Sequence, residues 1–324
     1  MVSLLELATI TEEGVRFLSP HDGSPMLLTP EHSISLQNTI GSDIIMQLDD
    51  VVVTTSPDPA RMREAMLRSP AGSTAASPRT RSLSPKTSSA LSRAGWIWIC
   101  VAACEAMAAG GTAGIAIGGL SGGEAKADYC RVVDACTGQL PENKPRYVMG
   151  IGYPEDLVVS VALGADMFDC VWPTRTARFG NAVTGKGVLN MRHARYADDL
   201  GPIEEGCGCR CCREGEGGLG VTRAFAHHLA AKETVGAHLL TMHNVWYQLE
   251  LMRGVRQAIM DDRYPAFLRR FFSDLYEGDK ERYPEWVVEA MTGVGVDLMG
   301  LAAGRVVVLR GMLPGILRPL EVCK

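Results

Sequence analysis

The sequence predicts an α/β protein with the fold of a (β/α)8 TIM barrel. Short apolar runs alternate with segments of helical periodicity, which is typical of a parallel sheet whose strands are joined by helices. Polar residues follow directly after the apolar runs, where the carboxyl ends of barrel strands form an active site. With 324 residues, 46% of them hydrophobic, the chain is long enough for one such domain.

Four apolar runs are predicted to be strands, and helical segments follow the first three. The predicted strands are residues 43–48, 113–120, 146–150 and 166–171. The predicted helices are residues 60–67, 125–140 and about 154–163. A loop rich in arginine is expected after the fourth strand.

One segment breaks this alternation. Residues 69–94 are rich in Ser, Pro, Ala and Arg without any period, a composition typical of a disordered linker. The segment lies between barrel units, where a helix and a strand are expected instead. Local composition and predicted fold therefore disagree here.

Charge and cysteine content narrow the class of protein. A net charge of −5 argues against a surface that is positive throughout, so any nucleic-acid contact must be a local patch. Ten cysteines, four of them crowded into one cluster, fit a reducing compartment better than a disulfide framework. The first residues lack a secretory signal, and the apolar run at residues 96–109 contains Glu105 and is too short to span a bilayer. We expect a soluble, cytoplasmic protein.

Residues 206–243 are predicted to hold a structural zinc ion. Cys207, Cys209 and Cys212 form a C-x-C-x-x-C cluster that can aim three sulfurs at one point, and Cys211 is either a bystander or exchanges roles with Cys212. The alternative is a set of free or oxidised thiols in a glycine-rich loop. A fourth ligand is expected from the histidines nearby, which are His227, His228, His238 and His243.

A carboxylate and two arginines follow the fourth predicted strand. Asp169 lies at the end of that strand, where it can act as a nucleophile or a base. Arg175 and Arg178 lie on the next loop and can bind phosphates or base edges. The alternative is a helix cap with surface arginines, which composition alone favours.

Three motifs together resemble one enzyme family. The string MFDCVWPTRTARFG at residues 167–180, the C-x-C-x-x-C cluster and the TMHN string around His243 resemble the queuine tRNA-ribosyltransferases, or tRNA-guanine transglycosylases. The likeness covers residues 1–68 and 113–297. It implies a zinc-bearing TIM barrel and a pentosyltransferase that exchanges the guanine at the wobble position (G34) of GU(N) anticodons for a 7-deazaguanine base.

The resemblance also implies residue roles. Asp169 would be the nucleophile that forms a covalent intermediate with the ribose, and Asp49 would accept hydrogen bonds from the base. The zinc ligands would be Cys207, Cys209, Cys212 and His243. The base pocket would comprise Gly119, Leu120, Gly122, Met149 and Gly150. The tRNA-contacting residues would be Gly150, Ile151, Gly152, Tyr153, Pro154, Glu155, Asp156, Thr174, Arg175, Thr176, Ala177 and Arg178.

Two positions indicate the eukaryotic type, which inserts queuine itself. Bacterial members resemble this chain but have a valine in place of Gly122 and a cysteine in place of Val51. The absence of a side chain at Gly122 would leave room for the cyclopentenediol arm of queuine. The eukaryotic type implies a heterodimer with a homologous accessory subunit, and tRNAs for Asp, Asn, His and Tyr. An association with mitochondria is left open.

The sequence departs from the family pattern in three places. Met1 aligns just after a DSGGFQ motif, so we expect an amino-terminal part with the general-base aspartate to be missing. No QGGLD motif lies between residues 68 and 113. Codons exist for which residues 70–78 and 91–101, read in the −1 frame, encode RWLDRCIA and VQGGLDLDLR, which suggests a frame-shifted stretch over residues 69–101. Residues 298–324 form a tail beyond the resemblance.

These departures shape the expected domains and activity. Residues 1–200 are predicted to form a partial barrel, and residues 201–297 the zinc-binding subdomain with the last barrel helices. We expect little base exchange from the chain as written. The alternatives are an inactive pseudoenzyme that binds tRNA or a catalytic subunit, and a sugar-metabolising barrel with a zinc knot.

Overall fold

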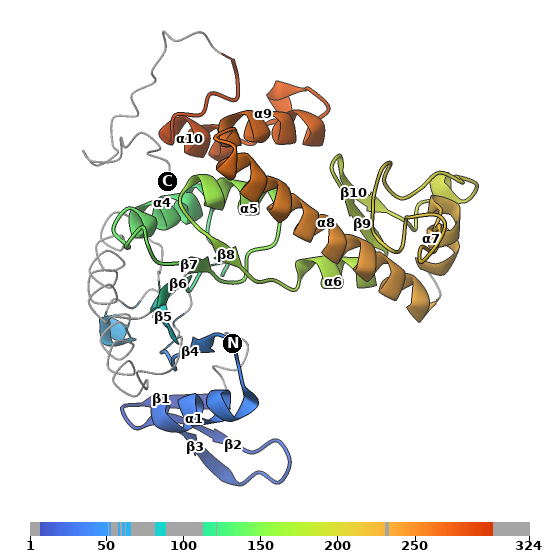
Figure 1. The fold of residues 1–324 in the computed structure, drawn as a ribbon. Helices are drawn as coiled ribbons and strands as arrows, with labels where there is room; N and C mark the ends of the chain where they lie inside the picture. Colours follow the sequence, from blue (N-terminus) through green and yellow to red (C-terminus); the bar gives the residue numbers. More distant parts are fainter. Residues whose placement is uncertain are drawn as a thin grey trace. The chain divides into compact units, whose positions relative to one another are not determined.

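The computed structural model describes residues 7–50, 52, 58, 60–61, 63–65, 82–88, 113–120, 122–230 and 233–300, with residues 82–88 described by their backbone (Figure 1). The chain divides into two compact units. The first comprises Met1–Ile151 and Ser160–Asp169, and the second comprises Gly152–Val159 and Cys170–Lys324.

A five-stranded parallel sheet forms the centre of the first unit (Figure 1). Its strands follow one another in chain order: β4 (Ile45–Met46), β5 (Ser82–Ser88), β6 (Gly114–Gly118), β7 (Arg146–Val148) and β8 (Met167–Phe168). All five residues of β6 are buried, as expected for a parallel strand covered on both faces. The predicted α/β class is confirmed. Among the described residues the sheet is open, so barrel closure stays a prediction.

Helices of the first unit pack beside this sheet. In α1 (Pro30–Ile40) the Thr29 hydroxyl accepts from the amide of His32, and Gly41 ends the helix in the left-handed conformation. The Gln37 amide side chain bonds both the N–H (2.8 Å) and the carbonyl (2.7 Å) of Met46, which ties α1 to the edge strand β4. The buried face of α4 (Lys126–Thr137) comprises Tyr129, Cys130, Val132, Val133, Cys136 and Thr137.

Three antiparallel strands lie at the start of the chain: β1 (Ala8–Thr11), β2 (Gly14–Leu18) and β3 (Pro25–Leu28). Gly14 allows β2 to approach β3 closely, because a Cβ at this position would lie 2.3 Å from the carbonyl oxygen of Leu28.

The predicted strands at 113–120, 146–150 and 166–171 coincide with β6, β7 and β8, and the helices at 125–140 and 154–163 coincide with α4 and α5 (Pro154–Ala162). The described residues between 60 and 65 are helical, as predicted. Within residues 69–94, where the composition is typical of a linker but the predicted fold requires a helix and a strand, Ser82–Ser88 forms β5, which pairs with both β4 and β6. The rest of 69–101 and the tail after residue 300 lie outside the described residues.

The second unit is mainly helical. Its elements are α6 (Trp172–Arg178), the hairpin β9 (Asn181–Thr184) and β10 (Gly187–Asn190), η3 (Ala194–Tyr196), α7 (Arg223–Ala230), α8 (Thr234–Met260), α9 (Tyr264–Leu275), η4 (Lys280–Arg282) and α10 (Glu285–Gly293). Gly236 permits tight packing where α8 begins, since a Cβ there would lie 2.8 Å from the backbone of Leu229 in α7. Within the described ranges, none of the helices has the length and apolarity needed to cross a bilayer.

Candidate active site and metal centre

Asp169 is an exposed carboxylate held by two donors. It follows β8, and its Oδ1 accepts hydrogen bonds from the Tyr147 hydroxyl (2.6 Å) and from the backbone N–H of Gly150 (3.0 Å). Both donors come from β7 and the turn after it, which pairs in parallel with β8. Because both bonds go to Oδ1, the second oxygen is not needed to hold the side chain in place.

The chemistry of Tyr147 suits this arrangement. Burial, and then the hydrogen bond to Asp169 and its negative charge, raise the pKa of Tyr147. The hydroxyl therefore stays protonated at neutral pH and donates to the Asp169 carboxylate. An ionised, exposed and oriented carboxylate is the form that attacks an electrophilic carbon.

Sequence reasoning missed Tyr147. The available signal was its position in the string RYVMG, two residues before the predicted pocket residue Met149. In a parallel sheet, the residue that ends one strand lies beside the residue that ends the next. A polar side chain near the end of β7 could therefore have been expected beside Asp169.

The predicted pocket residues share one edge of the sheet. Asp49 follows β4, Gly119 and Leu120 follow β6, and Met149 and Gly150 follow β7. Since the strands are parallel, all lie at their carboxyl ends, as Asp169 does.

Asp49 lines a cavity of about 390 Å³ together with residues of β1, β2 and the start of α1. The other predicted base-binding residues do not line this cavity. They are Gly119, Leu120, Gly122, Met149 and Gly150. That they form one pocket with Asp49 stays a prediction.

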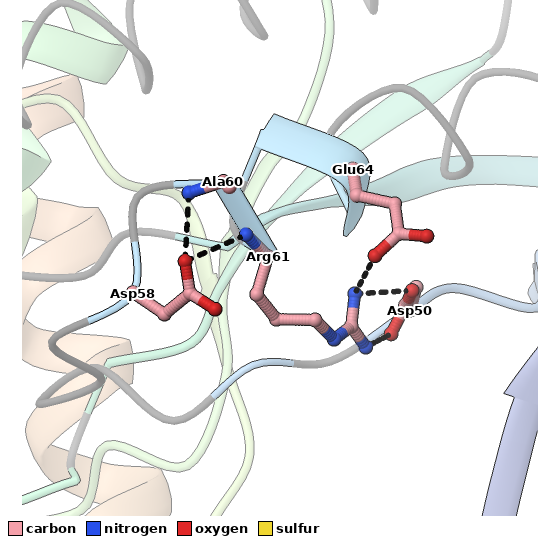
Figure 2. Close-up of polar contacts among 5 residues, drawn as sticks. All are labelled: Asp50, Asp58, Ala60, Arg61 and Glu64. Carbon is pink, nitrogen blue, oxygen red and sulfur yellow. Dashed lines mark hydrogen bonds and ion pairs between the residues drawn. The ribbon is translucent and has the colours of Figure 1, made fainter.

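The carboxylate next to Asp49 has a structural partner (Figure 2). Asp50 is buried and receives a two-pronged contact from Arg61, at 2.8 and 2.5 Å. Asp58 accepts from the backbone N–H groups of Ala60 and Arg61, and Glu64 lies 3.8 Å from the Arg61 guanidinium. A fork-shaped Arg–carboxylate pair fixes geometry as well as charge. It anchors the backbone that presents Asp49.

The Cys3His cluster is assembled in the second unit. The ligand atoms of Cys207, Cys209, Cys212 and His243 all lie within 4.8 Å of one another. His243 Nδ1 is 3.6, 3.7 and 3.3 Å from the three sulfurs in that order. Bond lengths of about 2.3 Å to sulfur and about 2.0 Å to nitrogen place tetrahedral ligands roughly 3.6 Å apart. The donor set and spacing therefore fit a structural metal ion.

Groups around the cluster set the state of its ligands. His243 Nε2 lies 2.8 Å from the carbonyl of Val183, which leaves Nδ1 to face the sulfurs. Hydrogen bonds from Cys207, Cys211 and Cys212 lower the pKa of Cys209, so one sulfur is readily a thiolate. The pKa of Cys211 is raised to about 12, first by its hydrogen bond to Cys209. Cys211 is buried and stays a thiol, in line with its interpretation as a bystander.

The other candidate histidines lie outside the cluster. His227 Nδ1 is 2.7 Å from the carbonyl of Met191, and the His227 ring packs edge-on against that of His228. His238 is exposed. Among the four candidates, the geometry selects His243.

The arginines at 175 and 178 were expected on a loop, and this is wrong. They lie on the short helix α6, which begins at Trp172 with Pro173 in its first turn. Pro173 and Ala177 face inward, while Arg175 and Arg178 are exposed. The helix therefore presents two cations on its outer side.

The two predicted tRNA-contacting segments are only partly accessible. Tyr153 is exposed and lies 5.1 Å from the Trp172 ring, centre to centre. The exposed members are available for contact with a ligand, and the buried ones can only support them. The buried members are Ile151, Gly152, Pro154, Asp156 and Ala177.

Comparison with known proteins gives one consistent result. The sequence model of the family described as queuine tRNA-ribosyltransferase matches residues 1–277. The queuine tRNA-ribosyltransferase catalytic subunit of Schizosaccharomyces pombe is 56% identical over 305 residues, which cover 92% of this chain and 74% of that protein. The Caenorhabditis elegans catalytic subunit is 43% identical over 316 residues, covering 92% and 76%. The queuine tRNA-ribosyltransferase of Novosphingobium aromaticivorans is 41% identical over 286 residues, covering 85% and 74%.

The parallel sheet with an oriented carboxylate at a strand end, the Cys3His cluster and these relatives define the class: a pentosyl-transferring glycosyltransferase. Within that class, the chain belongs to the queuine tRNA-ribosyltransferase family.

Proposed function

We propose that this protein is a transferase for the exchange of the guanine at the wobble position (G34) of tRNAs with GU(N) anticodons for queuine. Because little turnover is expected from the chain as written, the proposal is tested on the first, covalent step of the reaction. The observation that carries the proposal is the geometry of Asp169, an exposed carboxylate whose Oδ1 is fixed by Tyr147 and Gly150. An anchored carboxylate at the end of a strand is what a double displacement at a sugar carbon requires.

In the proposed reaction, an oxygen of Asp169 attacks C1′ of the ribose of nucleotide 34. The C1′–N9 bond breaks, and guanine leaves with the bonding pair and takes up a proton. The product is a covalent ester between Asp169 and the tRNA. The incoming base then gives up a proton, its ring nitrogen attacks C1′, and the carboxylate is released. Tyr147 and Gly150 N–H stabilise the carboxylate charge whenever it is free.

Two further residues support the choice of base. The Asp49 carboxylate would accept hydrogen bonds from the N–H donor edge of a guanine-like base, and the Arg61–Asp50 pair anchors the backbone beside it. Gly122 lacks a side chain where the cyclopentenediol arm of queuine would lie. The space left by the missing side chain at Gly122 favours queuine over a smaller precursor.

We propose zinc as the ion of the Cys3His cluster. Three thiolates and one imidazole suit zinc, and four protein ligands leave no open position for chemistry. The ion would hold the 207–212 loop to α8, and a (β/α)8 barrel is the proposed fold.

The remaining proposals follow from the relatives. Two of them are named catalytic subunits, which favours a heterodimer with a homologous accessory subunit. The tRNAs for Asp, Asn, His and Tyr are the proposed substrates, and the cytoplasm is the proposed location.

The test is a comparison of the chain with Asp169→Asn. Labelled tRNA is incubated with each protein without free base and the mixture is run on a denaturing gel. We expect a tRNA–protein adduct with the parent chain and with Asp198→Asn, an exposed aspartate used as control, and none with Asp169→Asn. Equal tRNA affinity with no adduct from any of the three would indicate a tRNA-binding partner without catalysis.

A further inference from the structure

Two amide side chains on one face of α8 bind the main chain of other elements. Asn244 is fully buried and makes three hydrogen bonds to main-chain groups. Its Oδ1 accepts from the N–H of Val183 (2.9 Å), and its Nδ2 donates to the carbonyls of Pro173 and Asn181 (both 3.0 Å). An Asn side chain has two donors and two acceptor sites, so most of its capacity is used on two other elements.

These bonds join α8 to α6 and β9. Pro173 is in α6, and Asn181 and Val183 are in β9, whose opposite edge pairs with β10. His243, the metal-ligand candidate, also contacts the carbonyl of Val183. Two successive residues of α8 thus occupy the edge of β9 that β10 leaves unpaired, and Figure 1 shows α6 lying along α8. Backbone groups buried in this way are costly to leave unsatisfied.

One turn further along α8, Gln248 repeats the pattern. Its Nε2 donates to the carbonyl of Gly152, and its Oε1 lies 3.5 Å from the sulfur of Cys170. Gly152 and Cys170 are in close contact, because a Cβ at Gly152 would lie 2.4 Å from that sulfur. Residues four apart lie on the same side of a helix, so Asn244 and Gln248 face the same way.

We infer that Asn244 and Gln248 are positioning residues that fix the two tRNA-contacting segments through their main chains. Gln248 holds the first of these segments, Gly150–Asp156, at the carbonyl of Gly152, and Asn244 holds α6. The exposed groups of those segments are Tyr153, Arg175 and Arg178. The inference rests on the proposed function for the role of these groups, while the contacts themselves stand independently.

Amide side chains suit this task. They satisfy buried carbonyl and N–H groups without adding a charge, and they impose a direction that apolar packing does not. Replacing the amide by a carboxylate keeps the shape and removes the donor. Asn244→Asp would then oppose two carbonyl oxygens, and Gln248→Glu would oppose one.

The experiment compares Asn244→Asp and Gln248→Glu with Gln257→Glu, the same chemical change at an exposed position of α8. Hydrogen–deuterium exchange, bound metal per chain and tRNA affinity are measured on each purified full chain. Because Asn244→Asp keeps the acceptor for the Val183 N–H and removes the donor to the Pro173 and Asn181 carbonyls, we expect faster exchange of α6 in this variant. In Gln248→Glu we expect faster exchange of residues 152–156. Both should weaken tRNA binding by roughly tenfold, with metal content equal to that of Gln257→Glu.

Unchanged exchange, or tRNA affinity equal to that of the control, would overturn the inference. Loss of metal with unchanged affinity of the folded fraction would also overturn it, because the residues would then serve stability alone. If Asn244→Asp does not fold, Gln248→Glu decides by itself, since Gln248 is only partly buried. If the parent chain does not bind tRNA, the proposed function fails, while exchange still decides whether these amides position the segments.

Discussion

At the scale of single residues, the proposed chemistry depends on which carboxylate atoms are held and which are left to react. Asp169 is held through one oxygen by Tyr147 and Gly150, and Asp50 is held through both oxygens by Arg61. The first arrangement suits chemistry and the second suits support. Sequence distinguished neither pair, because each depends on contacts between residues that are 11 to 22 positions apart.

The hydrogen bond between Tyr147 and Asp169 leads us to expect that the stability of the protein depends on pH in the alkaline range. Burial and the neighbouring carboxylate both raise the pKa of Tyr147, so the folded protein keeps its proton above pH 10, where the unfolded chain loses it. This group therefore reduces stability as pH rises above 10. Asp169→Asn removes the charge, so the pKa of Tyr147 should fall but stay above 10 because burial persists. Absorbance titration of tyrosinate measures it, and an unchanged curve would contradict the contact.

The cysteine cluster offers a matched pair of substitutions. Cys212 is a ligand candidate and Cys211 is not, although both are buried and adjacent. Cys212→Ser should lose the metal and lower the free energy of unfolding by several kcal/mol, since structural metal binding is coupled to folding. Cys211→Ser should keep one metal ion per chain. Metal analysis and thermal unfolding check both, and metal loss from Cys211→Ser alone would reverse the assignment.

At the scale of elements, the helices and strands that could be predicted from the sequence are the ones with a clear apolar pattern. The run that became β6 is aliphatic and fully buried, so its type and place were correct. Ser82–Ser88 lacks such a pattern, and β5 follows from its pairing with β4 and β6, which local composition does not encode. The helix α6 was missed because it is seven residues long, although Pro173 in its first turn is a start signal.

The exposed arginines of α6 lead us to expect a salt-dependent contribution to tRNA binding. If they bind tRNA phosphates, Arg175→Ala and Arg178→Ala should each weaken binding and reduce the slope of log affinity against log salt by about one. Arg256→Ala, at an exposed position of α8, should leave the slope unchanged. Filter binding over a salt series measures the slope. Equal slopes for all three variants would argue against phosphate contacts by α6.

At the scale of the whole molecule, the family could be predicted from three motifs, and the comparisons confirm it. A parallel sheet and the cluster of Cys207, Cys209, Cys212 and His243 could also be predicted, whereas β5 and its place in the strand order could not. The residues that support the site could not be predicted. Tyr147, Asn244 and Gln248 act through hydrogen bonds to backbone or carboxylate groups that are distant in sequence, and only the folded chain brings those groups together.

The central claim is that Asp169 carries the ribose of the tRNA during base exchange. The most direct measurement is to denature the protein during reaction with tRNA, digest the adduct with nuclease and protease, and locate the modified peptide by mass spectrometry. We expect a ribose-linked nucleotide on the carboxylate of Asp169. A modification on another residue, such as Asp49, would contradict it.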